Sequence, residues 1–299
     1  MLSNEQRITN NEPRMTNHEL RKAIIPLAGK GTRLMPVTAA IPKALFPLAD
    51  GAGRIKCVLH VILEHVLDAG IDQVALVVSP GQAEMLERYL DAARRMEGCS
   101  IPDRVTFIEQ THPRGFGDAV LCCAGFVGGE SFVVLLGDHV QVPVKGAKPG
   151  VTQVTEAFDL RGGAAMIGMH EIPVSELSKV GVAKGEPLGG CVYRCVDFVE
   201  KPDLETATSR LETPGLGEGV FLGHCGVYAF TPEIFDCLEE ETRHKSRVQG
   251  EVEMAAAQHR LLQRHPRDYY LLQIAGRACD MGTPEGYYRT VEAWRSVEW

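Results

Sequence analysis

Apolar runs alternate with segments of helical periodicity along the first half of the chain. Four short apolar runs are typical of buried strands, at residues 23–25, 74–78, 105–108 and 131–136. Three segments carry apolar residues at helical spacing, at residues 57–69, 82–96 and 118–126. The resulting β-α-β order predicts an α/β fold with a doubly wound, mostly parallel (mixed) Rossmann-like sheet and helices on both faces.

The second half continues this alternation around one irregular region. Strands are expected at residues 164–169, 196–199, 224–230 and 269–274. Helices are expected at residues 232–240, 252–262 and about 284–297, the last with Thr283 as its cap and Pro284 at its first position. Residues 173–219 are rich in Gly and Pro, which predicts an irregular lobe at about residues 170–225.

The start of the chain differs from the rest. Residues 1–20 are polar and lack apolar periodicity, so we expect a disordered tail followed by a single domain over residues 21–299. Met15 stands just before the first predicted strand, and we hypothesise that translation starts there. The tail has no apolar core of an export signal, and no run approaches the roughly 20 apolar residues of a membrane helix, so no membrane partner is expected.

A glycine-rich loop follows the first predicted strand, with the sequence Gly29-Lys30-Gly31-Thr32-Arg33. Its glycines allow backbone N–H groups to approach an anion, and Lys30, Arg33 and Lys43 add positive charge. The loop lacks the Gly-Lys-Ser/Thr ending of a Walker loop and the third glycine of a dinucleotide fingerprint. It is either a phosphate-binding loop of another type or an ordinary turn with solvated cations.

Charge and cysteine content exclude several classes of protein. The net charge is -8, and no Lys/Arg run forms a stripe along which a nucleic acid could bind, so nucleic acid is not an expected partner. The nine cysteines have neither disulfide-framework nor zinc-site spacing, which favours reduced cysteines and a cytoplasmic protein. The ten histidines also lack metal spacing and are interpreted as structural.

Three charged residues follow predicted strands and are candidates for a site. Asp138 comes directly after the buried run at 131–136, where an open α/β sheet binds its ligands, and Asp280 follows the last predicted strand. Carboxylates beside bound phosphates are typical of Mg²⁺ sites, whereas an isolated Gly-Asp pair is also typical of a turn or helix cap. Lys201 precedes a proline, which fits either a fixed phosphate ligand or an ordinary exposed turn.

The order of these motifs resembles the sugar nucleotidyltransferases, and within them the bacterial UTP–glucose-1-phosphate uridylyltransferases. The matching segments, which extend from Ala23 to Trp294, are AIIPLAGKGTRLMPVTAAIPKALFPL, EQTHPRGFGDAVLCCAG, VVLLGDHV, VGVA, FVEKP, GEVEM and CDMGTPEGYYRTVEAW. This resemblance implies a sheet of the nucleotide-diphospho-sugar transferase type, UTP and glucose 1-phosphate as substrates, Mg²⁺ as cofactor and a homo-oligomer.

The same resemblance implies a role for each candidate residue. Nucleotide binding would involve Ala28, Gly29, Gly31, Gln110 and Gly115, with the last two at the uracil edge. Arg33 would hold the phosphates that leave, Lys43 the phosphate under attack, and Lys201 the sugar phosphate. Gly181 and Glu200 would bind sugar hydroxyls, and Asp138 and Asp280 would bind the metal.

Several positions depart from the family pattern. Ala39-Ala40 replaces an expected lysine, Asp118 stands where many uridylyltransferases carry histidine, and Ala255 and Ala256 supply no carboxylate. These departures leave the sugar and the base open, so another nucleotide such as dTTP or GTP, or another hexose 1-phosphate, is an alternative. A non-catalytic sensor of sugar nucleotides on the same fold is a second alternative.

Overall fold

The computed structural model describes residues 20–50, 53–248 and 250–296. Most of the predicted tail, including Met15, lies outside the described residues. Leu20, which was expected to close that tail, is instead buried at 3% exposure in the hydrophobic core. The ordered part of the chain therefore begins at least one residue earlier than predicted.

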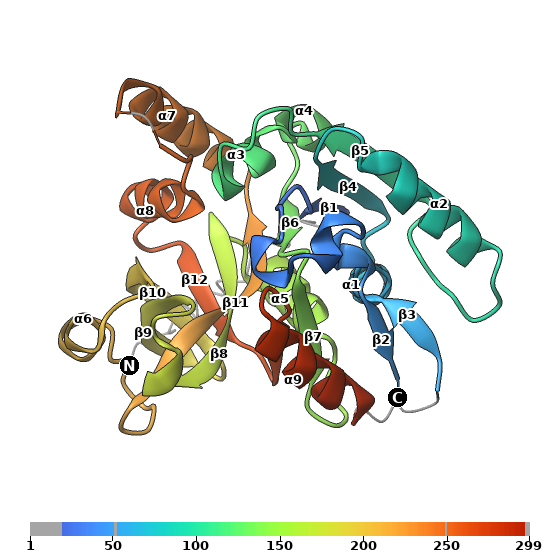
Figure 1. The fold of residues 1–299 in the computed structure, drawn as a ribbon. Coiled ribbons are helices and arrows are strands. Elements are labelled where there is room, and N and C mark those ends of the chain that lie inside the picture. Colours follow the sequence, from blue (N-terminus) through green and yellow to red (C-terminus); the bar gives the residue numbers. More distant parts are fainter. Residues whose placement is uncertain (1–19, 51–52, 249, 297–299) are drawn as a thin grey trace, which may run out of the picture.

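A nine-stranded sheet forms the centre of the molecule (Figure 1). In spatial order its strands are β5 (Arg104–Glu109), β4 (Gln73–Val78), β1 (Lys22–Pro26), β6 (Phe132–Leu135), β11 (Val220–Phe230), β8 (Ala165–Pro173), β12 (Tyr269–Gln273), β10 (Val192–Glu200) and β9 (Gly181–Gly189). The strands from β5 to β6 are parallel, whereas β11 is antiparallel to both of its neighbours β6 and β8. The prediction of a mixed α/β sheet is confirmed.

Helices cover both faces of this sheet, as predicted. One face packs against α1 (Val58–Asp68), α2 (Ala83–Arg94), α5 (Gly150–Arg161) and α9 (Pro284–Arg295). The other face packs against α3 (Phe116–Leu121), α4 (Ala124–Val127), α7 (Glu233–Val248) and α8 (Met254–Arg264). Helix α2 shows why such segments fold this way, because its buried residues Leu86, Leu90 and Ala93 recur at helical spacing on one face. The predicted Thr283 cap is confirmed, since its hydroxyl accepts a hydrogen bond from Gly286 N at 3.0 Å.

Two small two-stranded sheets lie beside the main one. Strand β7 (His139–Pro143) pairs with β13 (Gly276–Asp280), and β2 (Pro47–Ala49) pairs with β3 (Ile55–Cys57). In the β7–β13 pair Asp280 lies opposite His139, and Met281 N donates to Asp138 O at 2.9 Å. This pairing brings together two acidic residues that are 142 positions apart in the chain.

Two expectations about secondary structure were wrong. The helix expected at 118–126 is divided into α3 and α4 around Cys122 and Cys123. The region expected to be irregular contains the antiparallel strands β9 and β10, each nine residues long, and the short helix α6 (Leu204–Arg210). The strand predicted at residues 196–199 is the second half of β10. Register shifts within the β9–β10 pair interrupt its alternation of buried and exposed positions, so β9 and the first half of β10 were not predicted.

The cysteines agree with the prediction of reduced side chains. All nine cysteines are free, and Cys57, Cys123, Cys195, Cys225 and Cys237 are buried as small core residues. Among the described residues, no helix has both the length and the apolar character needed to cross a membrane.

Candidate active site

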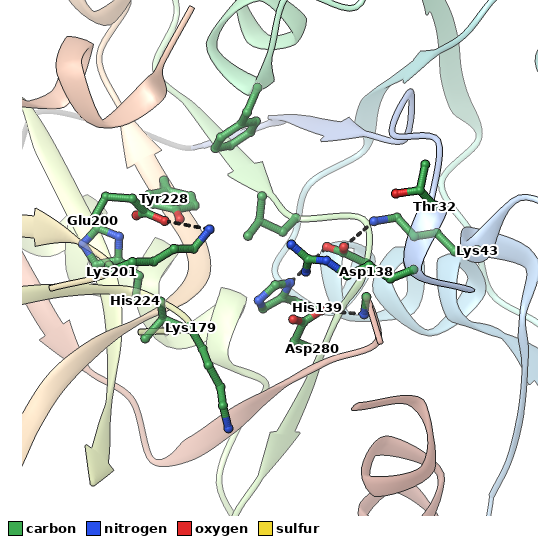
Figure 2. Close-up of a pocket in the computed structure, with 17 residues that line it drawn as sticks. Thr32, Lys43, Asp138, His139, Lys179, Glu200, Lys201, His224, Tyr228 and Asp280 are labelled. Atoms are coloured by element: carbon green, nitrogen blue, oxygen red, sulfur yellow. Dashed lines mark hydrogen bonds and ion pairs between the residues drawn. The ribbon is translucent and has the colours of Figure 1, made fainter. Parts of the chain in front are cut away.

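A cavity of about 430 Å³ opens between the loop after β1 and the hairpin of β9 and β10. Figure 2 shows its two sides facing each other. We call Gly31, Thr32, Arg33 and Lys43 the loop wall, and Lys179, Gly181, Glu200 and Lys201 the hairpin wall. Asp138, His139 and Asp280 also line the cavity. The structure thus brings together eight of the predicted site residues, namely Gly31, Arg33, Lys43, Asp138, Gly181, Glu200, Lys201 and Asp280.

The backbone of the loop wall requires glycine at one position. Gly31 has φ +59°, and a Cβ there would lie 2.9 Å from Thr38 Cγ2. Thr38 holds the loop further by donating its hydroxyl to Gly31 O at 2.9 Å. The chain then turns through a short 3₁₀ helix, Thr32–Leu34, whose Leu34 is buried while Arg33 faces the cavity. Burial of Leu34 therefore orients the arginine beside it.

Lys43 lies against the carboxylate of Asp138. The lysine ammonium donates to Asp138 Oδ2, and both side chains are about one-fifth exposed. On the other oxygen of Asp138, His139 Nδ1 lies at 3.0 Å. Burial by itself would raise the pKa of Asp138, but the hydrogen bonds and charges of His139 and Lys43 hold that pKa far below its usual range. Asp138 is therefore a carboxylate at neutral pH.

Asp138, His139 and Asp280 form a cluster that fits a metal ion, with one ligand atom from each residue within 4.8 Å of the others. Gly282 keeps this cluster open, because a Cβ there would lie 2.9 Å from Asp280 Oδ1 and 3.6 Å from Asp138 Oδ2. Two carboxylates suit a hard cation such as Mg²⁺. His139 was interpreted as a structural histidine, and its position next to Asp138 was the one signal in the sequence that it belongs to this cluster.

The hairpin wall places its residues by strand pairing. Gly181 on β9 lies opposite Glu200 on β10, and a Cβ at residue 181 would lie 2.9 Å from Glu200 Oε2 and 3.0 Å from His224 Nδ1. Glycine at this position leaves space between a carboxylate and an imidazole. Lys201 follows β10 with φ +49°, the only positive φ among the described residues other than glycine. Such a backbone conformation is costly for lysine, so the fold fixes where this side chain starts.

Other residues that line the cavity were not predicted from the sequence to belong to the site. Lys179, His224 and Tyr228 come from the hairpin side, and Phe116 lies at the start of α3. Burial lowers the pKa of His224 to about 4, so its imidazole is neutral at pH 7 and offers both a donor and an acceptor. No local motif surrounds these residues, and only the sheet pairing reveals that they belong to the site.

Four predicted nucleotide ligands lie outside the lining of this cavity: Ala28, Gly29, Gln110 and Gly115. Ala28 and Gly29 follow β1, Gln110 follows β5 and Gly115 precedes α3, and β4 lies between the parallel strands β1 and β5. Ser79, just after β4, donates its hydroxyl to Ala28 O at 2.9 Å, and Gln110 N donates to Val78 O at 2.8 Å. These residues extend the carboxyl edge of the sheet beyond the loop wall.

Comparison with known proteins agrees with this geometry. Residues 22–296 match the family described as Nucleotidyl transferase. A UTP–glucose-1-phosphate uridylyltransferase from Streptococcus pyogenes is 34% identical over 289 residues, which cover 91% of this chain and 88% of that protein. Its counterpart from Bacillus subtilis is 31% identical over 290 residues, covering 91% and 90% respectively.

A crystal structure of UDP-glucose pyrophosphorylase complexed with UDP-glucose has the same fold. It superposes with a TM-score of 0.75 at 26% identity and covers 92% of this chain and 98% of that one. The chain therefore belongs to the nucleotidyl transferase family, together with the UTP–glucose-1-phosphate uridylyltransferases to which it is similar.

Proposed function

We propose that this chain joins UTP and α-D-glucose 1-phosphate to give UDP-glucose and pyrophosphate, with Mg²⁺ as cofactor. The observation that carries the proposal is the cavity with cations on two facing walls and carboxylates between them. Two substrates that both carry phosphate need separate sets of cations, and the loop wall and the hairpin wall supply one each. The similarity to uridylyltransferases supports UTP and glucose 1-phosphate as the pair.

The chemistry requires positioning more than proton transfer. The attacking phosphate oxygen is already anionic at pH 7, so no general base is needed, and the obstacle is repulsion between two anions. We assign Arg33 to the phosphates that leave, Lys43 to the phosphorus under attack and Lys201 to the sugar phosphate. Placed in this way, the three cations neutralise charge while holding the phosphates in line.

The uncharged parts of the substrates have their own candidate ligands. Backbone groups of Ala28, Gly29 and Gly31 would border the nucleotide at the end of β1. Gln110 and Gly115 would meet the base at the end of β5, and Gly181 with Glu200 would meet the sugar hydroxyls. Asp138 and Asp280 would hold Mg²⁺, which when bound supplies positive charge to the phosphate oxygens. Two carboxylates facing an open space beside Gly282 support that assignment.

A substrate panel tests the proposal. Pyrophosphate release is measured for UTP, dTTP, GTP and CTP, each with glucose, galactose, mannose and N-acetylglucosamine 1-phosphates, and with and without Mg²⁺. We expect UTP with glucose 1-phosphate to give the highest kcat/KM. A different pair at the top of the ranking would replace the proposed substrates within the same reaction, whereas tight binding of UDP-glucose with no release from any pair would indicate a sensor.

We further propose that the protein acts in the cytoplasm as a homo-oligomer. Nine free cysteines support a reducing compartment. Cell fractionation and light scattering of the purified protein test the two statements separately. Recovery outside the cytoplasmic fraction, or a mass of one chain at micromolar concentration, would contradict them.

A further inference from the structure

The side-chain amide of Gln110 is held by two neighbours that accept hydrogen bonds. Gln110 Nε2 donates to Gly115 O at 3.2 Å and to Asp118 Oδ2 at 2.7 Å. Gln110 and Asp118 are both buried, at 6% and 2% exposure. Asp118 is held in turn by Arg114, whose guanidinium lies 2.7 Å from the other carboxylate oxygen.

These contacts determine which end of the Gln110 amide faces outwards. A backbone carbonyl has only lone pairs to offer, and the same holds for a carboxylate paired with a guanidinium. Turning the amide over would set Gln110 Oε1 against two acceptors, so only the observed orientation is stable. Both N–H groups of Gln110 are therefore committed within the protein.

Oε1 of Gln110, in contrast, accepts no hydrogen bond from the described residues. Across the described residues no donor reaches this oxygen, and it does not belong to the fully buried polar atoms that lack a partner. The oxygen is therefore not fully enclosed by protein, and it lies at the carboxyl end of β5, on the same edge of the sheet as the loop wall. A ligand group that meets Gln110 there encounters an acceptor only.

We infer that Asp118 is a positioning residue that selects the pyrimidine base by fixing the amide of Gln110. This inference rests on the proposed function, in which Gln110 meets the base of UTP. The hydrogen-bonding edge of uracil has a single N–H donor, N3–H, between two carbonyl oxygens, so an acceptor binds uracil at N3–H. Cytosine has a lone pair on N3 and is repelled by the same oxygen. The contact does not involve position 5 of the ring, so a methyl group there has no effect on it and thymine can bind as well as uracil.

Asp118→Asn tests this inference. Arg114 attracts the oxygen of the new amide, which leaves the NH₂ group of residue 118 facing Gln110. Only Gly115 O then still favours the original orientation, so the orientation with Gln110 Oε1 towards residue 118 and its N–H groups towards the base becomes populated. We expect the ratio of kcat/KM for UTP to kcat/KM for CTP to fall about tenfold or more, because the contact with N3–H of uracil changes from a hydrogen bond to a repulsion between two donors. The ratio does not depend on what fraction of the protein is folded.

Glu109→Gln is the matched control, since it makes the same carboxylate-to-amide change one residue from Gln110 at an exposed position. It should leave the ratio unchanged. Dissociation constants for UTP and CTP without sugar phosphate give the same comparison if Asp118→Asn turns over too slowly. A wild-type ratio retained in Asp118→Asn, in turnover or in binding, would overturn the inference. Absence of UTP turnover in the wild-type protein would instead overturn the proposed function.

Discussion

The loop wall and the hairpin wall bring positive charge to the same cavity by different means. On the loop wall, Arg33 and Lys43 lie in two short 3₁₀ helices between β1 and α1, and Lys43 already pairs with Asp138. On the hairpin wall, Lys201 directly follows a strand and is about half exposed, with Glu200 Oε1 3.6 Å away. The lysine of the loop wall is held closely before any ligand arrives, whereas the lysine of the hairpin wall is more exposed and makes a longer ion pair with Glu200.

This difference suggests a division of labour. A cation buried beside a carboxylate costs little reorganisation during reaction, which suits the phosphorus where charge develops. A half-exposed lysine on a strained but fixed backbone suits capture of an incoming anion. Variants that affect kcat should therefore lie near the loop wall, and those that affect KM for the sugar phosphate near the hairpin wall.

Asp138→Asn should have the largest effect. The change removes a proposed metal ligand and the partner of Lys43, so kcat should fall about 10²–10³-fold, the usual cost of losing one preorganised charge contact. Steady-state kinetics across a Mg²⁺ titration measure this effect. Asp91→Asn on the exposed surface of α2 is the control. Unchanged turnover at saturating Mg²⁺ would remove Asp138 from the metal site.

Acid sensitivity should be the next largest effect. Burial lowers the pKa of His65, on α1, to about 4, below the value of about 6.5 in an unfolded chain. The unfolded state therefore takes up the proton first, so stability is full above pH 6.5 and is lost as the pH falls towards 4. His65 alone contributes a loss of about 3 kcal/mol in the free energy of unfolding.

Urea unfolding between pH 4.5 and 7 of the wild-type protein and of His65→Gln measures this loss. The variant should lose less stability over that range, because it has one proton fewer to take up. Burial also lowers the pKa values of His170, on β8, and His224, on β11, to about 4, so part of the dependence of stability on pH should remain in the variant. An equal loss of unfolding free energy with falling pH in the two proteins would contradict the role of His65.

Lys201→Met should weaken binding of the sugar phosphate more than binding of UTP. Loss of a hydrogen bond from a charged donor should raise KM for glucose 1-phosphate about 10- to 100-fold, with little change in KM for UTP. Lys148→Met removes an exposed lysine that pairs with Glu156 and does not line the cavity. An equal rise in both KM values would mean that Lys201 does not distinguish the substrates.

The smallest effect is expected at the cap of α9. Thr283→Ala removes the hydroxyl that accepts from Gly286 N, which should cost about 1 kcal/mol of stability. Because Asp280 lies three residues before this cap, the apparent affinity for Mg²⁺ should fall slightly as well. Thermal unfolding and a Mg²⁺ titration measure the two effects. Thr208→Ala on α6 is the control, since its hydroxyl bonds only to carbonyl groups of its own helix.

The two walls also differ in how far the sequence predicted them. Strands β1, β4 and β6 are apolar on both faces and are separated by amphipathic helices. A short stretch of sequence was therefore enough to predict each of these strands. Of the β9–β10 hairpin only residues 196–199 were predicted as a strand, because register shifts break the alternation elsewhere and Pro187 with several glycines is typical of a loop. Strand β7 and helix α5 were also missed.

The sequence by itself determined the residues on which the proposed reaction depends. Gly31, Arg33, Lys43, Asp138, Lys201 and Asp280 stand in local motifs at predicted strand ends, and a strand end is where an open α/β sheet exposes side chains. Tertiary structure alone decided their partners. The pairing of β7 with β13 makes one cluster of Asp138, His139 and Asp280, and the fold at Gly115 places Asp118 against Gln110. Such contacts depend on strand register and on loop closure over long stretches of chain, and no local pattern of residues encodes them.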